Sequence, residues 1–369
     1  MDIKMQTLAS LSTDGKGSYG IGASAVDRSD DLYTYLRITD IRDDGTLDFA
    51  GLKSVDDENA SQYLLKPNDI VFARTGASTG RNYFYDGTDG DFVYAGFLIK
   101  FSLDPNKVNP KYVKYYCLSD DYRGWIHSFN TGSTRGNINA QTLGKMPIPI
   151  PPRPQQDGIV SILSSIDDKI RKNTEINQNL IQQAQSIFQN MFPDVLSSNG
   201  TDNLGQLISF SNGKKRPQAT GTIPVYGGNG VLSYTSQANA ENCVIIGRVG
   251  AYCGNTFLCT SSCWVSDNAI QARSKSSESQ LFAYYLLKNA SLPSRHIGTG
   301  QPLITQGILN SISVVMPHDD IINQFNVTVE PLQQMIDSNK LENNQLSQIR
   351  ENLLPKLMNG EIDVSNITL

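Results

Sequence analysis

One glycine-rich stretch of the sequence has the residue types of a phosphate-binding loop. It reads NDIVFARTGASTGRNYF from Asn68 to Phe84, and it places Arg74, Gly76 and Gly80 after an apolar run. A nucleotide-binding P-loop requires GxxxxGK followed by Ser or Thr, because the lysine contacts the β- and γ-phosphates and the hydroxyl holds Mg²⁺. This stretch has a shorter glycine spacing and no such lysine. It does not predict nucleotide chemistry.

The stretch occurs twice in the chain. Its second form reads NCVIIGRVGAYCGNTFL, in which Arg248, Gly250 and Gly254 each follow their counterparts by 174 positions. A second pair of stretches corresponds at an offset of 166 positions. They are FNTGSTRGNINAQTLGKMPIPIPP and HIGTGQPLITQGILNSISVVMPH. A period near half the chain exceeds the roughly 20 to 50 residues of solenoid repeats. The sequence therefore predicts a tandem duplication of one domain.

The two arginines should have a role that both copies share. Because glycine adopts backbone conformations that other residues avoid, the glycines should shape a turn and the arginines should brace a loop. The residues of this structural loop are Arg74, Gly76, Gly80, Arg248, Gly250 and Gly254. Contact between the arginines and phosphate is the alternative.

The sequence lacks catalytic and metal-binding patterns. It has no Asp or Asn followed by Pro-Pro and an aromatic, as amino-methyltransferases carry, no Walker A loop and no HExxH. Its three histidines are scattered, and Cys253, Cys259 and Cys263 lack a CxxC spacing. We expect no catalytic residue, metal site or cofactor in this chain, and buried structural thiols in place of a zinc site.

Length and composition predict two ordinary globular cores. The chain has 369 residues, of which 39% are hydrophobic, and domains usually hold about 100 to 200 residues. No apolar run approaches the roughly 18 residues of a membrane-spanning helix, and MDIKMQTLAS lacks the plan of a signal peptide. Five cysteines in a chain of this length favour a reducing compartment. We expect a cytoplasmic protein with no membrane partner.

Each copy divides into a strand-rich front and a helical back. YLRITDI and DIVFARTG in the first copy, and IPVYGGNG and CVIIGRVG in the second, predict short strands between turns. The prolines of MPIPIPPRP and VVMPHDD predict extended connectors at the borders. The expected domains are a first front over 1–150, a connector and central helix over 151–193, a second front over 194–318 and a C-terminal helix over 319–369.

Behind each border the apolar period becomes helical. Steps of four and three residues continue over more than four heptads in both copies, which predicts two helices that bury their seams against each other as a strut. An antiparallel alignment pairs Asn173 with Asn343 and Asn177 with Asn339, whereas a parallel one pairs residue 173 with 339. Polar seam residues fix register. We predict the antiparallel alignment, because it alone separates the fronts.

Two prolines should limit the second helix. Because proline removes a backbone donor, Pro331 and Pro355 are expected to interrupt this helix or to mark its ends. The alternative for both seams is an ordinary amphipathic core helix, which a long and duplicated heptad pattern disfavours.

The charge balance limits how this chain could bind phosphates. The formal net charge is −5, and basic residues outnumber acidic ones only over residues 194–318, by 8 to 5. A non-specific phosphate binder needs a strong basic excess. Any phosphate binding by this chain should therefore depend on a few placed cations.

The order of these motifs resembles that of the DNA specificity subunit of type I restriction and modification enzymes over nearly the whole chain. The matching stretches are YLRITDIRDDGTLD, NDIVFARTGASTG, TGSTRGNI, PIPPRPQQDGIVSILSSIDDKI, IPVYGGNG and ENLLPKLMNGEI. The resemblance implies an α+β fold, with two mixed α/β target recognition domains separated by two long helices that form an antiparallel coiled coil. It also implies a non-catalytic reader of a bipartite double-stranded DNA target, with one half-site per domain and a spacer set by the helices.

The resemblance further implies partners and their cofactors. Two methyltransferase subunits would dock on the helical faces, and restriction subunits would join them. S-adenosylmethionine, ATP and Mg²⁺ would belong to those subunits. The competing function class is a pseudo-twofold protein-interaction adaptor that does not read DNA sequence.

Four short stretches hold the candidate DNA contacts. GKGSYGIG, the loop 131–137, NGKKRPQ and VYGGNG combine cations, short hydrogen-bonding side chains and glycines that let a backbone approach a groove. The resemblance places the loop 131–137 near DNA. The candidate residues are Lys16, Tyr19, Ser133, Thr134, Arg135, Lys214, Lys215, Arg216, Tyr226 and Asn229. A solvated or tight turn is the alternative for each stretch.

Overall fold

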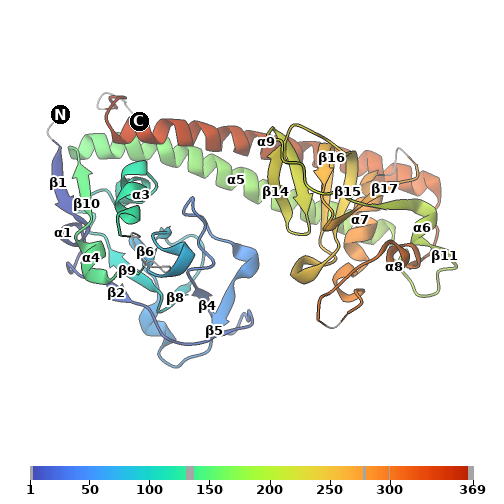
Figure 1. Cartoon of the computed structure of the whole chain (residues 1–369), viewed down its shortest axis with the longest axis horizontal. Coiled ribbons are helices and arrows are strands. Elements are labelled where there is room, and N and C mark those ends of the chain that lie inside the picture. The colour runs from blue at the N-terminus through green and yellow to red at the C-terminus, as the bar shows by residue number, and fades with distance from the viewer. Residues whose placement is uncertain (1–2, 130–136, 277–279, 299, 365–369) are drawn as a thin grey trace. The chain divides into compact units, whose positions relative to one another are not determined.

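The chain forms two compact units. Unit 1 comprises Met1–Arg171 with Asn343–Leu369, and unit 2 comprises Lys172–Glu342. The computed structural model describes residues 3–129, 137–276, 280–298 and 300–364. Each unit holds one strand-rich part, named front 1 (3–150) and front 2 (194–318), and a portion of each long helix (Figure 1).

Front 1 contains three small sheets. One has the strand order β2-β9-β6-β7, another has β3-β5-β4-β8, and β1 pairs with β10. The strands are β1 (Lys4–Thr7), β2 (Ser18–Tyr19), β3 (Ala25–Val26), β4 (Tyr33–Leu36), β5 (Lys53–Val55), β6 (Asp69–Ala73), β7 (Asn82–Tyr85), β8 (Phe92–Tyr94), β9 (Leu98–Ser102) and β10 (Pro147–Ile150). The helices are α1 (Leu8–Leu11), η1 (Phe49–Gly51), η2 (Ala60–Tyr63), η3 (Gly76–Ser78), α2 (Pro110–Tyr116), α3 (Asp120–His127) and α4 (Ala140–Gly144).

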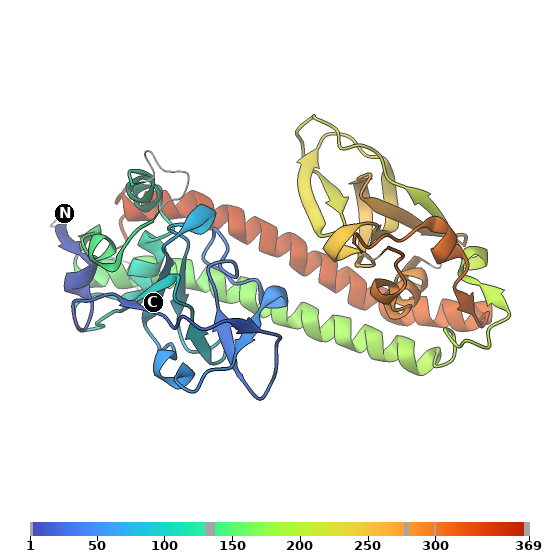
Figure 2. The ribbon, with the colours of Figure 1, turned by 60° about the horizontal axis from the view of Figure 1, so that its bottom comes forward.

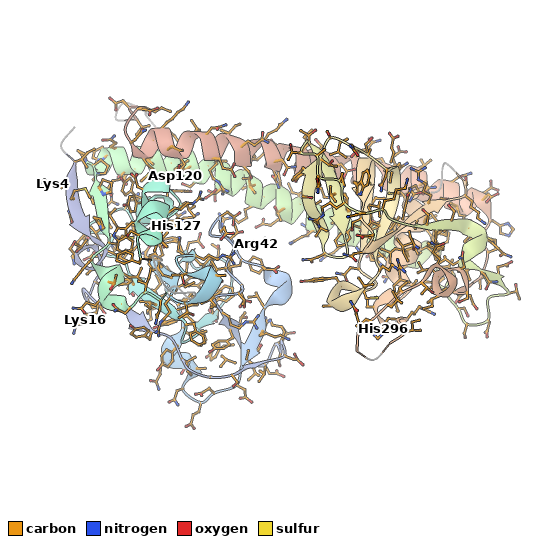
Figure 3. All side chains as sticks on the ribbon, viewed as in Figure 1. Lys4, Lys16, Arg42, Asp120, His127 and His296 are labelled. Carbon is orange, nitrogen blue, oxygen red and sulfur yellow. The ribbon has the colours of Figure 1, made fainter. Side chains whose placement is uncertain are left out.

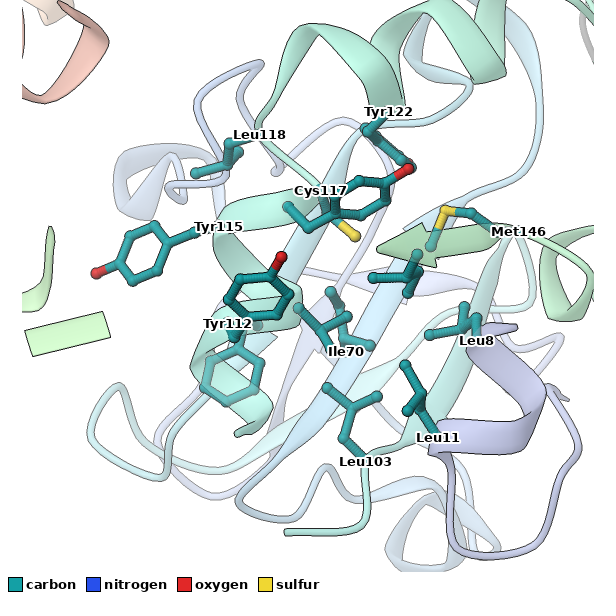
Figure 4. Close-up of a cluster of buried hydrophobic side chains, with 14 of the residues drawn as sticks. Leu8, Leu11, Ile70, Leu103, Tyr112, Tyr115, Cys117, Leu118, Tyr122 and Met146 are labelled. Atoms are coloured by element: carbon teal, nitrogen blue, oxygen red, sulfur yellow. The ribbon is translucent and has the colours of Figure 1, made fainter. Parts of the chain in front are cut away.

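The main core of unit 1 joins the helices to the β6–β9 sheet. Figure 4 shows Leu8, Ile70, Tyr112 and Met146 converging in this core, and all four side chains are buried. The buried tyrosines keep their hydroxyls satisfied, since Tyr112 donates to the Pro149 carbonyl at 2.7 Å. Burial without loss of hydrogen bonds makes this packing favourable.

Front 2 contains one large sheet and one small one. The large sheet has the order β12-β17-β15-β16-β13-β14, and β11 pairs with β18. The strands are β11 (Asp202–Asn203), β12 (Ile208–Asn212), β13 (Ile223–Gly227), β14 (Gly230–Thr235), β15 (Ala240–Gly247), β16 (Thr256–Val265), β17 (Ala269–Ser274) and β18 (Ser313–Val314). The helices are α6 (Leu204–Leu207), η4 (Gly250–Tyr252), α7 (Gln280–Asn289), η5 (Leu292–Ser294) and α8 (Gln306–Asn310).

The duplication predicted from the sequence is present in the strand order. β2-β9-β6-β7 of front 1 corresponds to β12-β17-β15-β16 of front 2, and every pairing within both sets is antiparallel. Each front also contains one parallel strand pair. In front 1 it is β4 with β8, and in front 2 it is β13 with β16. The two fronts therefore share one frame of strands.

Two long helices, α5 (Arg153–Met191) and α9 (Asp319–Met358), complete both units. They lie side by side in Figure 1 and Figure 2. In unit 1 the Asn343 amide donates to the Ile170 carbonyl at 3.4 Å, and in unit 2 the Asn339 amide donates to Asn177 Oδ1 at 2.9 Å. Partner numbers fall along α9 as they rise along α5, so the predicted antiparallel direction is confirmed.

Polar groups in the seam find partners inside it. Asn173 and Asn177 are buried, and the Asn173 amide donates to Glu342 Oε2 at 2.7 Å. The Asn177 amide also donates to the Ile336 carbonyl at 3.3 Å. A buried amide is costly unless it is hydrogen-bonded, so these contacts favour one register over its neighbours.

Two local expectations were wrong. Pro331 and Pro355 neither interrupt nor end α9, which runs continuously through both. Both prolines are exposed, so water can satisfy the carbonyls that lose a helical donor. The strand predicted over YLRITDI ends at Leu36, because the Asp40 carboxylate accepts from the Arg37 N–H at 2.8 Å and turns the chain.

Candidate nucleic-acid interface

Arg74 and Arg248 follow equivalent strands, β6 and β15, in the two fronts. The Arg74 N–H donates to the Phe97 carbonyl at 3.1 Å, and the Arg248 N–H donates to the Asn268 carbonyl at 3.0 Å. The backbone around the two arginines is thus held in the same way.

The glycines after each arginine build the same turn. Gly76 and Gly250 have φ of 70° and 74°, and Gly80 and Gly254 have φ of 90° and 89°. This left-handed region favours glycine, because a Cβ would clash with the backbone. The turn closes where the Gly80 N–H donates to the Ala73 carbonyl at 2.9 Å, and the equivalent bond from Gly254 measures 2.8 Å.

Around Arg74 the structure brings together three segments that lie far apart in the sequence. The Arg74 guanidinium lies 5.0 Å from the centre of the Tyr19 ring, and its Nη2 donates to Asn137 Oδ1 at 3.4 Å. The Tyr19 hydroxyl accepts from the Ala140 N–H at 3.1 Å. A cation over an aromatic face is attracted by the ring quadrupole. Arg74 therefore contacts the segment that directly follows the loop 130–136.

Arg248 lies on the same frame with fewer contacts. The Ile304 N–H donates to the Arg248 carbonyl at 2.9 Å, as the Ile138 N–H donates to the Arg74 carbonyl at 3.0 Å. Among the described residues, the Arg248 side chain has no hydrogen-bond acceptor or carboxylate partner. Its Nε, like that of Arg74, is buried without an acceptor in the described part of the chain.

A third equivalent segment escaped the sequence comparison. Gly20 and Gly213 follow β2 and β12, and a Cβ on either would lie 2.2 Å from the Tyr94 carbonyl oxygen or 1.9 Å from that of Ser266. The next residues match as well, because Ile21 bridges to Ala95 and Lys214 bridges to Ser266. SYGIG and SNGKK thus occupy equivalent positions, where the strand end approaches a neighbouring backbone closely. The signal available in the sequence was the shared Ser-x-Gly, which is too short to stand out.

We call this region the arginine edge. In front 1 it comprises Tyr19, Arg74, Phe97 and Asn137, and in front 2 it comprises Asn212, Arg248, Asn268 and Leu303. Its members come from equivalent strand ends and from the segments after residues 130–136 and 299. The frame is common to both fronts, but the side chains around the arginine differ.

Lys214, Lys215 and Arg216 extend from the arginine edge of front 2. All three are exposed. The Lys214 N–H donates to the Val265 carbonyl at 2.9 Å, and Trp264 Nε1 donates to the Lys214 carbonyl at 3.2 Å. The backbone of Lys214 is therefore held by hydrogen bonds, while the charged side chains of the cluster lie in solvent.

Tyr226 and Asn229 flank the tight turn between β13 and β14. Asn229 is exposed at the turn. Tyr226 packs against Phe257 with ring centres 6.4 Å apart, and burial raises the pKa of its hydroxyl. The Tyr226 ring is thus part of a small core, whereas Asn229 is open to a ligand.

The remaining candidates lie in front 1. Lys16 is exposed at the periphery of unit 1, where Figure 3 labels it. Tyr19 is 42% exposed, and its hydroxyl and ring are held by Ala140 and Arg74. Ser133, Thr134 and Arg135 lie outside the described residues.

The described residues offer little for catalysis or metal binding. All five cysteines are free and buried. Burial raises the pKa of the Cys117 thiol, and the hydrogen bond with Cys243 raises the pKa of Cys263 to about 12. Protonated thiols are poor nucleophiles and metal ligands. No cluster of His, Cys, Asp or Glu in the described chain could hold a metal ion, and no described helix is long and apolar enough to cross a membrane.

The fold and its duplication agree with comparisons against known proteins. The model of the type I restriction modification DNA specificity domain matches residues 28–182 and again residues 202–351. The chain belongs to this family. It is a type I restriction–modification specificity subunit, the non-catalytic subunit that determines DNA target recognition, and the cofactors of such a system reside in its methyltransferase and restriction subunits.

Individual relatives are distant. The chain is 22% identical to the MjaIX specificity subunit of Methanocaldococcus jannaschii, over 70% of both chains. It is 22% identical to the EcoprrI specificity subunit of Escherichia coli, over 77% of this chain and 76% of that protein. A match at 29% identity to the HindI specificity subunit of Haemophilus influenzae covers 35% of this chain and only 29% of that protein.

One solved structure supports the fold. The crystal structure of a type I restriction–modification S subunit from M. genitalium aligns with a TM-score of 0.56, over 97% of this chain and 96% of that one, at 19% identity. The predicted fold class, two target recognition domains with two long antiparallel helices, is confirmed.

Proposed function

We propose that this chain reads a bipartite double-stranded DNA target, with one half-site bound by each front. The observation that carries the proposal is the arginine edge, which is built twice with the same backbone hydrogen bonds and different side chains. Side chains select bases at the groove edges, whereas backbone contacts only position a protein on DNA. One frame with two sets of side chains therefore suits two different half-sites.

The proposed contacts fall into two groups. Those of front 1 are Lys16, Tyr19, Ser133, Thr134 and Arg135, and those of front 2 are Lys214, Lys215, Arg216, Tyr226 and Asn229. The exposed cations suit phosphates, and the exposed amide of Asn229 suits a base edge. The fronts and helices act as separate modules with the boundaries 1–150, 151–193, 194–318 and 319–369.

The same proposal includes partners. Two methyltransferase subunits dock on the helices, restriction subunits join them, and the complex works in the cytoplasm, where S-adenosylmethionine, ATP and Mg²⁺ serve those subunits. Support comes from the family assignment and from the exposed residues that both long helices carry. The net charge of −5 fits a chain that shares the DNA backbone with partners.

Methylome sequencing of cells that carry this chain with its methyltransferase tests the proposal directly. We expect methylation within one split motif, two short defined sequences separated by a fixed gap of undefined bases. The control is the same cell with the methyltransferase alone. Methylation that does not depend on this chain, or no sequence preference in any assembly, would favour the protein-interaction adaptor.

A second experiment tests whether the helices set the gap. Deleting 172–178 from α5 and 338–344 from α9 removes one heptad from each helix and leaves Ile170 and Leu180 in the seam. The deletion shortens the pair by about 10.5 Å, at about 1.5 Å per residue. B-DNA rises about 3.4 Å per base pair, so the preferred gap should fall by roughly three base pairs.

The readout is selection from a library with both half-sites fixed and the gap varied. The deleted segments contain the seam asparagines Asn173, Asn177, Asn339 and Asn343. A folded, DNA-binding deletion variant that still prefers the parental gap would refute the spacer role.

A further inference from the structure

The two fronts build the same turn beside their arginines and place different side chains on it. In front 1 the Leu98 N–H donates to the Ala95 carbonyl at 2.8 Å, and in front 2 the Ala269 N–H donates to the Ser266 carbonyl at 3.0 Å. The third residue of each turn is the one whose carbonyl accepts from the arginine N–H. It is Phe97 in front 1 and Asn268 in front 2.

Both side chains point away from the cores. Phe97 is 59% exposed, and Asn268 is exposed with no hydrogen bond to its amide from any described residue. A single exposed hydrophobic residue is ordinary on a protein surface. The position of these two residues is informative, because the same backbone site holds an exposed aromatic ring in one front and an exposed amide in the other.

The turn lies among the proposed DNA contacts in both fronts. In front 1 the Gly96 N–H donates to the Ile21 carbonyl at 2.7 Å, two residues after Tyr19. In front 2 the turn begins at Ser266, which bridges to Lys214 of the basic cluster. If these cations and the arginine edge face DNA, the side chains of Phe97 and Asn268 face it too.

We propose that Phe97 and Asn268 are specificity-determining residues, each contacting a base in its own half-site. The amide of Asn268 matches the paired acceptor and donor that adenine presents in the major groove, and the Phe97 ring matches the methyl group of thymine. The backbone around them is fixed by the arginine and by the turn, so neither side chain can withdraw by a shift of the loop. This inference rests on the proposed function.

Exchanging the two side chains tests the inference within one molecule. Phe97→Asn and Asn268→Phe are made separately in the complex with the methyltransferase, and each variant selects its target from a library randomised in both half-sites. Phe97→Asn should change the preferred base at one position of the front 1 half-site. Asn268→Phe should lower discrimination at one position of the other half-site by about 5- to 150-fold, the range of a good side-chain contact to a base.

The untouched half-site is the internal control in each variant. Phe49→Ala removes an exposed phenylalanine of front 1 that lies outside the arginine edge, and it should leave both half-sites unchanged. Where a swap lowers the thermal midpoint of the complex, Phe97→Ser or Asn268→Asp replaces that swap, and its base preferences are judged in the same way.

The outcomes separate the inference from the proposed function. In one outcome the wild-type complex selects a split motif while both swaps leave every base preference intact. That result overturns the role of Phe97 and Asn268 but leaves the proposed reading of a bipartite target standing. A swap that alters both half-sites equally also overturns it, because the change would then act through folding or assembly. A wild-type complex that selects no motif overturns the proposed function itself.

Discussion

Front 1 and front 2 share a frame of strands but differ in how many of their cations form ion pairs. Nine cations of front 1 lie in ion pairs: Arg28, Arg37, Arg42, Lys53, Arg81, Lys100, Lys107, Lys114 and Arg123. Within the described part of front 2, no cation forms an ion pair with a carboxylate. Carboxylates neutralise much of the positive charge of front 1, whereas the exposed Lys214, Lys215 and Arg216 of front 2 remain available to phosphates.

The fronts also differ at the margin of the shared frame. In front 2 a single strand, β16, pairs with β15 along most of its length and with β13 at its last two residues, Trp264 and Val265. In front 1 the equivalent path is split into β7 and β8 by residues 86–91, and the chain between β4 and β5 is longer. The frame that holds the arginine is kept and the periphery varies, as expected where loops carry specificity and strands carry stability.

The largest expected difference concerns the second glycine of each turn. A Cβ on Gly254 would lie 2.4 Å from the backbone nitrogen of Pro293, whereas one on Gly80 would lie 2.5 Å from the Ile126 side chain. Both positions also have a left-handed φ. Gly254→Ala should lower the free energy of unfolding of its unit by about 2 to 5 kcal/mol, and Gly80→Ala by less, because a side chain can shift.

The two tryptophans allow each unit to be followed alone. Trp125 lies in unit 1 and Trp264 in unit 2, so Trp125→Phe leaves a fluorescence reporter for unit 2 during urea unfolding, and Trp264→Phe leaves one for unit 1. Equal losses for the two glycine variants would show that the Pro293 backbone yields as easily as a side chain.

The charge contrast predicts which front dominates the salt dependence of DNA binding. Replacing Lys214, Lys215 and Arg216 with alanine should weaken binding to all sequences, on the order of 100-fold at 0.1 M salt. The slope of log K against log salt should flatten by up to about 2.7, at roughly 0.9 per lost phosphate contact. The measurement is a titration of the assembled complex at several salt concentrations.

A matched control removes three cations of front 1 that already have carboxylate partners. Arg42→Ala, Lys53→Ala and Arg123→Ala together should change the slope by less than about 1, because exposed ion pairs contribute little and leave little charge for phosphate. If this control flattens the slope as much as the front 2 variant, the difference between the fronts is not one of available charge.

Arg135 should act on one half-site only. If it makes a paired contact with a base, Arg135→Ala costs about 1 to 3 kcal/mol and relaxes one position of the front 1 half-site. The duplication places Gln301 at the matching position, so the Arg135 variant should leave the other half-site unchanged. Selection from a library randomised in both half-sites measures both effects. Equal loss at both halves in the Arg135 variant would indicate damage to folding.

The smallest expected effect concerns the stability of unit 1 at acid pH, which should depend on the Asp167 carboxyl. Burial of the Asp167 carboxylate disfavours its ionisation, but Lys114 and Arg350 outweigh burial and lower its pKa, with contacts of 2.8 Å and 2.9 Å. A carboxyl whose folded pKa lies below its unfolded value of about 3.9 adds stability above that value. This stability is lost as pH falls through the folded pKa.

Unit 1 should therefore lose stability below about pH 4 more steeply than its own Asp167→Asn variant. Unfolding of the Trp264→Phe protein between about pH 5 and pH 2 measures the slope for unit 1. The same slope with and without the Asp167 carboxyl would show that other groups govern acid unfolding.

Much of this architecture could be predicted from the sequence, because some constraints are local or periodic. A heptad pattern requires a buried seam, so the two helices followed from the apolar steps, and their antiparallel direction followed from the expectation that it alone separates the fronts. Arg74 and Arg248 revealed the duplication, since the turn after each needs glycine at two fixed positions. The prolines were misjudged because their cost depends on exposure, which no local pattern gives.

Tertiary structure alone decided which residues meet at the arginine edge. Tyr19, Arg74 and Asn137 are separated by tens of positions, and only strand pairing brings them together. The match between Gly20 and Gly213 was hidden because it rests on a close backbone approach and little sequence identity. The pairing of cations with carboxylates was equally invisible, because ion pairs form across the fold. Helical periodicity and tight turns depend on residues close together in the sequence, so the sequence alone determined them. Contacts between distant segments form only when the whole domain packs, so they required the tertiary structure.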